Sequence, residues 1–342
     1  MAAPILVTGG FGAIGSYVLR RLIDDGHPVV VYSRRANYGL VPDLEGDDRL
    51  VHAAGDVQDR DRLRGVAQEH GVQRIIHLAA AVGPELERRP ELGYQVNVLG
   101  SLNVFEVAKQ LNLERVVFTS SKSYYGSLTG DHAPPTFKAV TEDYVGQTAN
   151  VYGATKKALE DAAYHYRRLF GLDLIALRLG STYGPGKDVP GHAGGYSAMK
   201  SRMVETAVRG EPLVVPAPNS PDDIVYNHDV AKGAVLACFA PPTAHWQFNI
   251  AGGRLVTLRQ LGDEIKRLVP EHQLSFLEPD GDGASQKPLG NTASLLSIDR
   301  ARAELGYEPD FPGVSAIADY VSRYRFLQAA GRQSDERVSS RA

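Results

Sequence analysis

The chain has 342 residues, of which 43% are hydrophobic and 23% charged, with a formal net charge of −3. This length and composition predict a globular protein with two lobes, and the lack of a basic tract argues against nucleic acid and favours a protein or small-molecule partner. No apolar run is long enough to span a bilayer, and the N-terminus lacks the pattern of a secretory signal. We therefore expect a cytoplasmic protein that does not bind membranes.

The order of apolar runs predicts an α/β fold. Residues 4–35 contain an apolar run, a glycine-rich turn, apolar residues at helical spacing and a second apolar run, the pattern of strand, turn, helix and strand. The alternation continues through RIIHLAAA, RVVFTSS, the helical NVYGATKKALED and LDLIALRLG. Strands that alternate with helices predict a Rossmann-type doubly wound parallel sheet, here over residues 1–180 and about 224–255.

The rest of the chain has a different composition. Its loops are rich in glycine and proline, as in YGPGKDVPGHAGG and VPAPNSPDD, and its helices are shorter. We expect a smaller C-terminal substrate-binding lobe over residues 181–223 and 256–328, at the carboxyl ends of the strands, where open α/β sheets bind ligands. The polar residues 329–342 predict a disordered tail.

The stretch TGGFGAIG predicts a dinucleotide site. Gly9, Gly12 and Gly15 follow a strand and begin a helix. One glycine permits the tight turn, one lets the backbone approach a pyrophosphate, and one lets helix and strand pack closely, while the free N–H groups of the helix bind the anion.

The end of the second strand indicates which cofactor is used. A carboxylate there would bind the adenosine ribose of NAD, but the chain has Ser33, Arg34 and Arg35 instead. Two guanidinium groups suit the extra phosphate of NADP, so the sequence favours NADP over NAD, although such arginines can also be merely solvated. Asp56 ends the predicted third strand. Its carboxylate either accepts a hydrogen bond from the adenine amino group of the cofactor or only forms a turn.

Tyr152 and Lys156 lie one turn apart on the predicted helix and form a candidate proton-transfer pair. A lysine about 5 Å away supplies roughly 3 of the roughly 4 kcal/mol needed to lower the tyrosine pKa from about 10 to about 7, and the positive charge of the oxidised nicotinamide adds more. Ser121, at the end of a predicted strand, offers a hydroxyl to orient the substrate oxygen. The spacing recurs at Tyr196 and Lys200, but that pair follows a glycine-rich loop, and we expect its lysine to lie on the surface.

Several motifs, in order, resemble those of the extended short-chain dehydrogenase/reductases, also called the NAD-dependent epimerase/dehydratase family, over about residues 3–328. They are TGGFGAIG, GDVQD, HLAA, SSKSYYG, YGATK, RLGSTYGPG, NIAGG and IDRARAELGYEP. The resemblance implies that Ser121, Tyr152 and Lys156 are catalytic, that Asn97 supports the site, and that Lys156 holds the nicotinamide ribose. It also implies a homodimer formed through two helices of each subunit, including the Tyr152 helix. The expected cofactor-binding residues are Gly9, Gly12, Ala13, Ile14, Gly15, Ser33, Arg34, Arg35, Asp56, Val57, Leu78, Ala79, Ala80, Asn97, Tyr152, Lys156 and Leu179.

Departures from the family pattern narrow the range of reactions and substrates that we expect. Dehydratases of this family carry an Asp-Glu pair where the chain has Lys122 and Ser123, so we do not expect water elimination. Nucleotide-sugar epimerases usually carry an asparagine in the segment of Ser181 and an arginine where the chain has Asp222 and Asp223. Two carboxylates there would repel a diphosphate. An alignment shift of a few residues would instead bring Arg202 or Arg254 to that place.

The leading hypothesis is an NAD(P)-dependent oxidoreductase that acts on a secondary alcohol or ketone of a sugar, sugar acid or hydroxy acid. The alternatives are an NAD-dependent sugar epimerase and a non-catalytic cofactor-sensing protein, and the intact catalytic set argues against the latter. Lys122 either points to solvent or faces the pocket, where it suits an anionic substrate. No group of residues has the spacing of metal ligands, so we predict no metal. The candidate substrate residues are Val82, Lys122, Ser123, Ser181, Thr182, His192, Tyr196 and Arg202.

Overall fold

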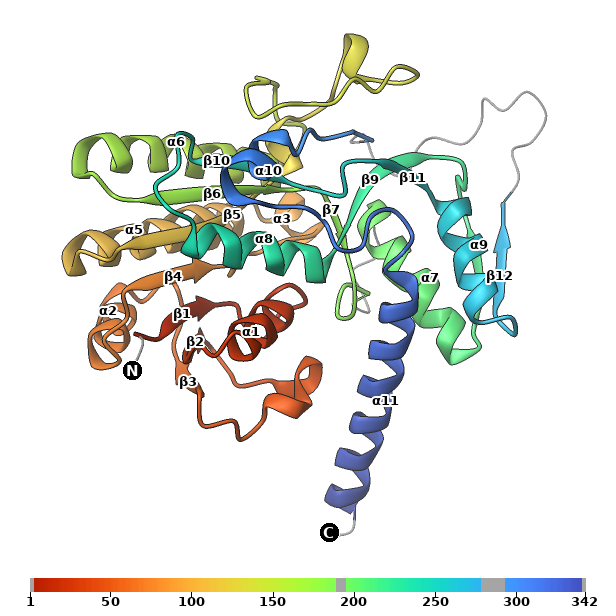
Figure 1. Ribbon diagram of the computed structural model, residues 1–342, viewed down its shortest axis with the longest axis horizontal. Coiled ribbons are helices and arrows are strands. Elements are labelled where there is room, and N and C mark those ends of the chain that lie inside the picture. Colours follow the sequence, from red (N-terminus) through yellow and green to blue (C-terminus); the bar gives the residue numbers. More distant parts are fainter. Residues whose placement is uncertain (1–2, 189–194, 278–292, 340–342) are drawn as a thin grey trace.

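A seven-stranded parallel sheet forms the middle of the larger lobe in the computed structural model, which describes residues 3–188, 195–277 and 293–339 (Figure 1). The strand order is β10-β6-β5-β4-β1-β2-β3, so the order reverses between β1 and β4. This arrangement confirms the predicted Rossmann-type sheet and places ligands at the carboxyl ends of the strands. The strands are β1 (Ile5–Thr8), β2 (Val29–Ser33), β3 (Leu50–Ala54), β4 (Arg74–His77), β5 (Arg115–Ser121), β6 (Leu174–Leu179) and β10 (Gln247–Ile250).

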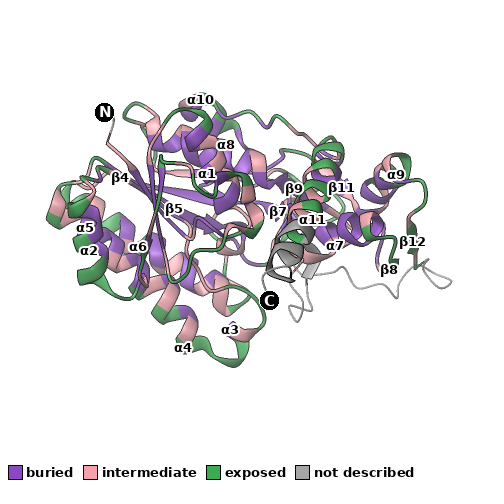
Figure 2. Ribbon diagram, turned by 90° about the horizontal axis from the view of Figure 1, so that it is seen from below, coloured by how far each residue is buried: buried purple, intermediate pink, exposed green. Residues whose placement is uncertain are grey.

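Helices cover both faces of the sheet (Figure 2). One face carries α1 (Gly15–Asp24), α8 (Asn227–Phe239) and α10 (Asp299–Leu305), and the other carries α2 (Arg60–Glu69), α5 (Gly100–Leu111) and α6 (Val151–Phe170). Successive strand residues point to opposite faces, so Leu6 packs into the core beneath α2 and α5, whereas Val7 packs into the core beneath α1 and α8. Because both faces are buried, the strands are continuous apolar runs in the sequence.

Short elements connect the strands and helices of the larger lobe. Two helical turns, α3 (Glu85–Arg88) and α4 (Pro90–Gly93), and a π-helical segment, η3 (Tyr94–Leu99), lead into α5. The 3-10 turns are η1 (Tyr38–Leu40), η2 (Pro42–Leu44), η4 (Lys122–Tyr124) and η5 (Gly130–His132).

The smaller lobe follows β6 and has its own core. It contains a three-stranded sheet in the order β11-β9-β7 and a two-stranded sheet of β12 and β8. Tyr183, Met203, Val256, Leu261 and Tyr320 are among the buried residues that join its strands and helices. Its elements are β7 (Ser181–Tyr183), α7 (Gly195–Arg209), β8 (Pro212–Val215), β9 (Pro221–Tyr226), β11 (Leu255–Thr257), α9 (Leu258–Leu268), β12 (Gln273–Phe276) and α11 (Ile317–Ser339).

The C-terminal segment differs from the expectation. We expect disorder from residue 329, but α11 continues to Ser339 and extends away from the smaller lobe (Figure 1). Its first turns are anchored by packing, since Ile317 and Tyr320 are fully buried. Adding a residue to an existing helix costs much less than starting one, so polar residues with good helix propensity can extend it.

Candidate active site

The glycine-rich turn between β1 and α1 has the shape that a pyrophosphate requires. Gly9 has a φ of +69°, and a Cβ on it would lie 2.9 Å from Ala79 N. A Cβ on Gly15 would lie 2.3 Å from Gly9 O, too close for any other residue. The N-cap residue of α1, Ile14, provides no side-chain cap, and the first turn of the helix contains no acid. The N–H groups of Ser16 and Tyr17 donate to backbone carbonyls, whereas those of Ala13, Ile14 and Gly15 have no acceptor among the described residues and are available to an anion, which fits a dinucleotide.

The end of β2 carries no acid and two exposed arginines. Ser33 Oγ donates to Arg35 O at 3.0 Å and lies 3.2 Å from His52 Nε2. Arg34 and Arg35 are exposed, and neither guanidinium has an ion-pair partner in the part of the chain that the structure describes. The groups that favoured NADP in the sequence are thus accessible at the expected strand end.

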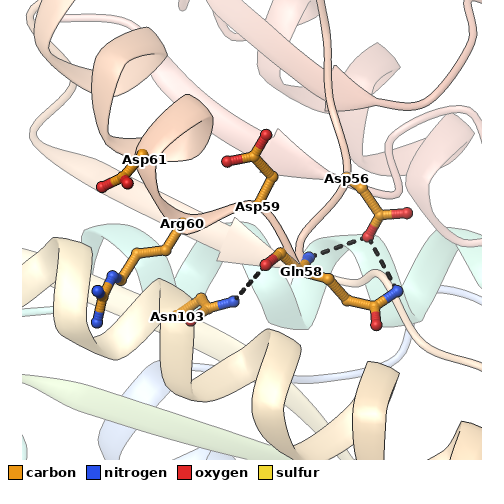
Figure 3. Close-up of a pocket in the computed structure, with 6 residues that line it drawn as sticks. All are labelled: Asp56, Gln58, Asp59, Arg60, Asp61 and Asn103. Carbon is orange, nitrogen blue, oxygen red and sulfur yellow. Dashed lines mark hydrogen bonds between the residues drawn. The ribbon is translucent and has the colours of Figure 1, made fainter.

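An open depression of about 670 Å³ lies beyond β3, next to Asp56 (Figure 3). Asp56 Oδ1 accepts from Gln58 N at 2.9 Å, so this carboxylate forms the turn that we considered as the alternative role. Asn103 Nδ2 of α5 donates to Gln58 O at 3.1 Å and ties the loop to the helix (Figure 3). The lining has three carboxylates and one guanidinium, which suits an uncharged base better than a phosphate. It consists of Asp56, Gln58, Asp59, Arg60, Asp61 and Asn103, beside the buried Val57.

Asn97 holds the loop after β4 against α6. Its Oδ1 accepts from Ala81 N at 2.7 Å, and its Nδ2 donates to Ala81 O at 3.0 Å and to Thr155 Oγ1 at 3.2 Å. The side chain is fully engaged by the protein, so Asn97 acts as a positioning residue. The half-buried Leu78, Ala79 and Ala80 precede this contact, while Val82 is 54% exposed.

His77 and Asn227 are buried polar residues near the predicted cofactor site, and the sequence assigned a role to neither of them. His77 Nδ1 lies 2.7 Å from Thr8 Oγ1, and its Nε2 lies 2.9 Å from Ser101 Oγ. Burial, with the nearby lysine charge, lowers the pKa of His77 to about 3, so the imidazole is neutral. Asn227 of α8 donates from Nδ2 to Ala13 O at 3.1 Å and so braces the glycine-rich turn. His77 begins the motif HLAA, but the motif did not indicate its role, and only the tertiary contacts reveal the roles of His77 and Asn227.

Tyr152 lies in the first turn of α6, close to the end of β5. The Asn150 side chain caps the helix by accepting from Gly153 N at 2.7 Å. A Cβ on Gly153 would lie 2.5 Å from Ser123 O, so glycine allows the helix start to approach the turn after β5. Ser121 Oγ accepts from Ser123 N at 3.1 Å in that same turn.

The three predicted catalytic side chains meet at this point. The Ser121 side chain lies close enough to the Tyr152 phenol to lower its pKa. Lys156 Nζ lies 5.6 Å from the centre of the Tyr152 ring and donates to Thr119 O at 2.7 Å. Leu179 lies beside Ser121 in the register of β5 and β6.

The pKa of Tyr152 contradicts the expected activation by lysine. Burial raises the pKa of Tyr152 to about 12, and the Ser121 side chain offsets this only in part. Burial also lowers the pKa of Lys156 to about 8, against the opposing effect of the Glu160 charge. Without cofactor, the pKa of Tyr152 thus moves in the opposite direction to the expected fall toward 7, which also counted the positive charge of the oxidised nicotinamide. The expectation included the Coulomb attraction between the phenolate and the lysine ammonium, but it did not include the larger free-energy cost of burying the phenolate.

Lys122 and Asp222 form a buried ion pair beside Ser121. Lys122 is only 9% exposed, and its Nζ donates to Asp222 Oδ1 at 2.6 Å, so it does not point to solvent. The Ser181 hydroxyl donates to the other oxygen of Asp222. Lys200 Nζ lies 4.0 Å from the same carboxylate and is fully buried, so the expected surface position of Lys200 is wrong. The amino-acid spacing did not reveal that α7 turns this residue inward toward β7.

Asp223 does not face the site. Its oxygens accept from Gly252 N at 2.8 Å and Leu296 N at 3.1 Å, and burial raises its pKa to about 7. The expected pair of repelling carboxylates is therefore wrong, because Asp222 is paired with lysine and Asp223 with the backbone.

Of the remaining candidate substrate residues, the structure describes the side chains of Thr182 and Arg202 only. Thr182 is 8% exposed in β7, and Arg202 Nε donates to Asp188 Oδ1 at 3.0 Å, so that guanidinium already has a partner. Tyr196 belongs to α7, but its side chain and all of His192 lie outside the described residues.

One group in the described residues approaches a metal-ligand arrangement. Ligand atoms of His228, Asp229 and Asp310 lie within 4.8 Å of one another. However, Asp229 accepts from the backbone of Asp310 and Phe311, and Asp310 pairs with Lys232. These groups are occupied by protein partners, so the arrangement gives no argument for a metal. In the ranges that the structure describes, no helix could cross a membrane.

Comparison with known proteins decides the family. The model of the NAD dependent epimerase/dehydratase family matches residues 5–251. The chain belongs to this family. The UDP-glucose 4-epimerase of Mycolicibacterium smegmatis is 31% identical over 94% of this chain and 98% of that protein. A putative UDP-glucose 4-epimerase of Methanocaldococcus jannaschii is 28% identical over 93% and 98%.

A solved structure supports the same assignment. The crystal structure of the Thermotoga maritima UDP-glucose 4-epimerase with UDP-glucose has a TM-score of 0.80 and 25% identity, covering 95% of this chain and 99% of that one. The family resemblance expected from the motifs is thus confirmed. The protein is an enzyme of the NAD-dependent epimerase and dehydrogenase kind.

Proposed function

We propose that the protein transfers hydride between a nicotinamide cofactor and a secondary alcohol or ketone, with Tyr152 as the acid and base. The observation that carries this is the convergence of three side chains: Ser121 lies close enough to lower the pKa of the Tyr152 phenol, and Lys156 Nζ lies 5.6 Å from the centre of the Tyr152 ring. Ser121 orients the substrate oxygen, Tyr152 holds or takes its proton, and the bound cofactor supplies or accepts the hydride.

The residues proposed to bind the cofactor lie at the same edge of the sheet as the catalytic residues. The turn of Gly9, Gly12 and Gly15 and the free amino end of α1 are suited to the pyrophosphate, and Lys156 to the nicotinamide ribose. Replacing Tyr152 by Phe should remove activity while leaving cofactor affinity nearly unchanged. A fully active variant would refute the proposed role of Tyr152.

A net oxidation or reduction of a small polar molecule is the favoured reaction. Asp222 occupies the place where an arginine for a substrate diphosphate was expected, and it is already paired with Lys122. Arg202 is paired with Asp188 and so does not provide a ready replacement. A sugar, sugar acid or hydroxy acid fits this site better than a nucleotide diphosphate. Steady consumption of added cofactor in the presence of such a substrate tests this choice.

An NAD-dependent nucleotide-sugar 4-epimerase is the second candidate. It is supported by relatives of nearly full length that carry this name. An epimerase oxidises and re-reduces the same carbon, so it should purify with tightly bound NAD and convert UDP-glucose without added cofactor. Mass spectrometry of the released cofactor, followed by turnover without addition, separates the two candidates.

We also propose that NADP is preferred over NAD. The support is the exposed pair Arg34 and Arg35 at the end of β2, where no acid is present to bind a ribose hydroxyl. Replacing both arginines by Glu should raise KM for NADP by about tenfold or more, since each charge-assisted contact with a phosphate is worth about 1.5–3 kcal/mol. KM for NAD should change little. Equal effects on both cofactors would contradict the preference.

A cytoplasmic homodimer built through α5 and α6 is the proposed assembly. Exposed apolar side chains on and beside these helices support it, since such groups gather at interfaces. They include Leu99, Tyr164, Leu169 and Phe170, which are 55%, 50%, 62% and 49% exposed. Sedimentation equilibrium should give twice the chain mass, and Leu169→Glu should shift it toward the monomer.

A further inference from the structure

The C-terminal helix α11 contacts the larger lobe, although its first turns belong to the core of the smaller lobe (Figure 1). Asp319 Oδ2 accepts from the Tyr226 hydroxyl at 2.8 Å, and that hydroxyl lies 2.7 Å from the hydroxyl of Tyr17. Tyr17 lies in the first turn of α1, directly after the glycine-rich turn. Arg323 follows Asp319 by one helical turn, so both residues project from the same side of α11 toward the larger lobe.

Arg323 binds the segment that connects β2 with β3. We call residues 37–44, which include η1 and η2, the β2–β3 segment. Arg323 Nη2 donates to Leu40 O at 2.7 Å and lies 3.4 Å from Asp43 Oδ1. The same Asp43 oxygen accepts from Arg20 Nη2 of α1 at 2.8 Å. The segment is therefore held by α1 and α11 together.

The contact of Arg323 with Leu40 is better shielded from water than the ion pair of Asp43 with Arg20. The side chain of Arg323 is 17% exposed, whereas those of Arg20 and Asp43 are 27% and 34% exposed. Ion pairs exposed to solvent contribute little to stability, but a charge-assisted hydrogen bond in a shielded position contributes more. We therefore expect the guanidinium of Arg323 to contribute most to holding η1 in place.

The β2–β3 segment packs against the glycine-rich turn. The Tyr38 ring meets the ring of Phe11, in the middle of TGGFGAIG, edge to face with 4.9 Å between the ring centres. Leu40 and Ala13 lie against the same glycine, because a Cβ on Gly186 would lie 2.6 Å from Leu40 Cδ1 and 3.3 Å from Ala13 Cβ. Displacement of η1 would therefore remove support from the turn that is suited to the pyrophosphate.

The segment also continues from the arginine pair that we propose for the extra phosphate of NADP. Arg34 and Arg35 are exposed after β2, and only Ala36 separates them from residue 37. Their backbone is fixed on one side by the strand and on the other side by the β2–β3 segment. The position of both guanidinium groups therefore depends in part on the contacts of Arg323.

We propose that Arg323 is a positioning residue of the cofactor site, which holds the β2–β3 segment against the glycine-rich turn and so slows the release of the cofactor. This inference rests on the proposed cofactor site and adds a residue of the smaller lobe to it. Arg323 itself binds Leu40 O and Asp43, so it acts through the segment. Faster release should therefore accompany greater motion of η1.

The rate of cofactor release tests the inference. Arg323→Met keeps most of the side-chain volume and removes both contacts, while Val41 and Leu44 remain buried, so the protein should stay folded. Stopped-flow fluorescence with NADPH and with NADH should show release about tenfold faster, the ratio that one charge-assisted hydrogen bond provides. Arg325→Met, on the exposed side of the same helix, is the matched control and should release the cofactor at the unchanged rate. Release from Arg323→Met within about twofold of the control would overturn the inference.

Hydrogen exchange and a conservative variant distinguish positioning from a general loss of stability. The Val41 amide donates to Tyr38 O at 2.8 Å, and its exchange should be faster in Arg323→Met, whereas exchange in β1 should not change. Faster release without faster exchange of Val41, or with equally faster exchange in β1, would overturn the inference. Arg323→Lys keeps a charged donor and should release the cofactor more slowly than Arg323→Met. Equal release from these two variants would contradict the role of the hydrogen bond.

The proposed cofactor site and the role of Arg323 fail in different ways. Gly15→Ala should abolish cofactor binding whatever residue replaces Arg323, because a Cβ on Gly15 would lie 2.3 Å from Gly9 O. Binding of neither NADPH nor NADH by the unsubstituted protein, with no cofactor released on its denaturation, would refute the site and with it the inference. Binding that Gly15→Ala abolishes, with release that Arg323→Met leaves unchanged, would retain the site and refute the role of Arg323 alone.

Discussion

The protonation of Tyr152 leads to a prediction for the pH dependence of the two reaction directions. Its pKa of about 12 lies about two units above the ordinary value, which corresponds to about 3 kcal/mol against ionisation. At pH 7 about one molecule in 10⁵ carries the phenolate in the protein alone. Reduction of a ketone needs the phenol as a proton donor, and oxidation of an alcohol needs the phenolate as an acceptor.

Initial rates at saturating cofactor and substrate test this reasoning. Reduction should be independent of pH from about 6 to 10, because the phenol stays protonated, and oxidation should rise about tenfold per pH unit from about 6 to 9. Tyr152→Phe should lower kcat by about 10²–10⁴ and remove the slope. A reduction rate that falls with an apparent pKa near 7 would show that the phenol ionises there, and would refute the argument from burial.

Three further predictions concern the framework of the site. Arg178 forms a fully buried ion pair with Glu160 at 2.7 Å, so Arg178→Met should cost about 3–5 kcal/mol in urea unfolding, and a loss below about 1 kcal/mol would contradict this. Gly15→Ala should abolish cofactor binding in a fluorescence titration, whereas Gly65→Ala, which meets no atom within 4 Å, should bind normally. The pKa of Lys156 is about 8 in the fold against 10.5 when unfolded, so the unfolded chain binds the extra proton between these values. Stability relative to Lys156→Met should therefore rise by about 3 kcal/mol from pH 8 to 10.5, and a constant difference in urea unfolding would exclude the shift.

The parallel sheet and the glycine-rich turn were predictable because their signals are local. A buried parallel strand needs a continuous apolar run, and the turn after β1 needs glycine wherever a Cβ would meet backbone, as at Gly9 and Gly15. The candidate catalytic set was predictable for a similar reason, since Tyr152 and Lys156 are one helical turn apart and Ser121 ends a strand.

The errors concern groups whose environment comes from distant parts of the chain. Lys200 was expected on the surface and is buried, and Asp222 was expected to be a free carboxylate although it pairs with Lys122, 100 residues away. The pKa of Tyr152 was misjudged because burial depends on everything packed around the phenol.

The sequence by itself determined the fold class, the position of the glycine-rich turn and the spacing of Tyr152 and Lys156, because each depends on neighbours within a few residues. Only the tertiary structure decided that Lys122 pairs with Asp222 and that Lys200 is buried near the same carboxylate. An ion pair between separate strands and helices requires the packed lobes to bring its members together and to exclude water from them. The ion pair beside Ser121 therefore became visible only in the folded chain.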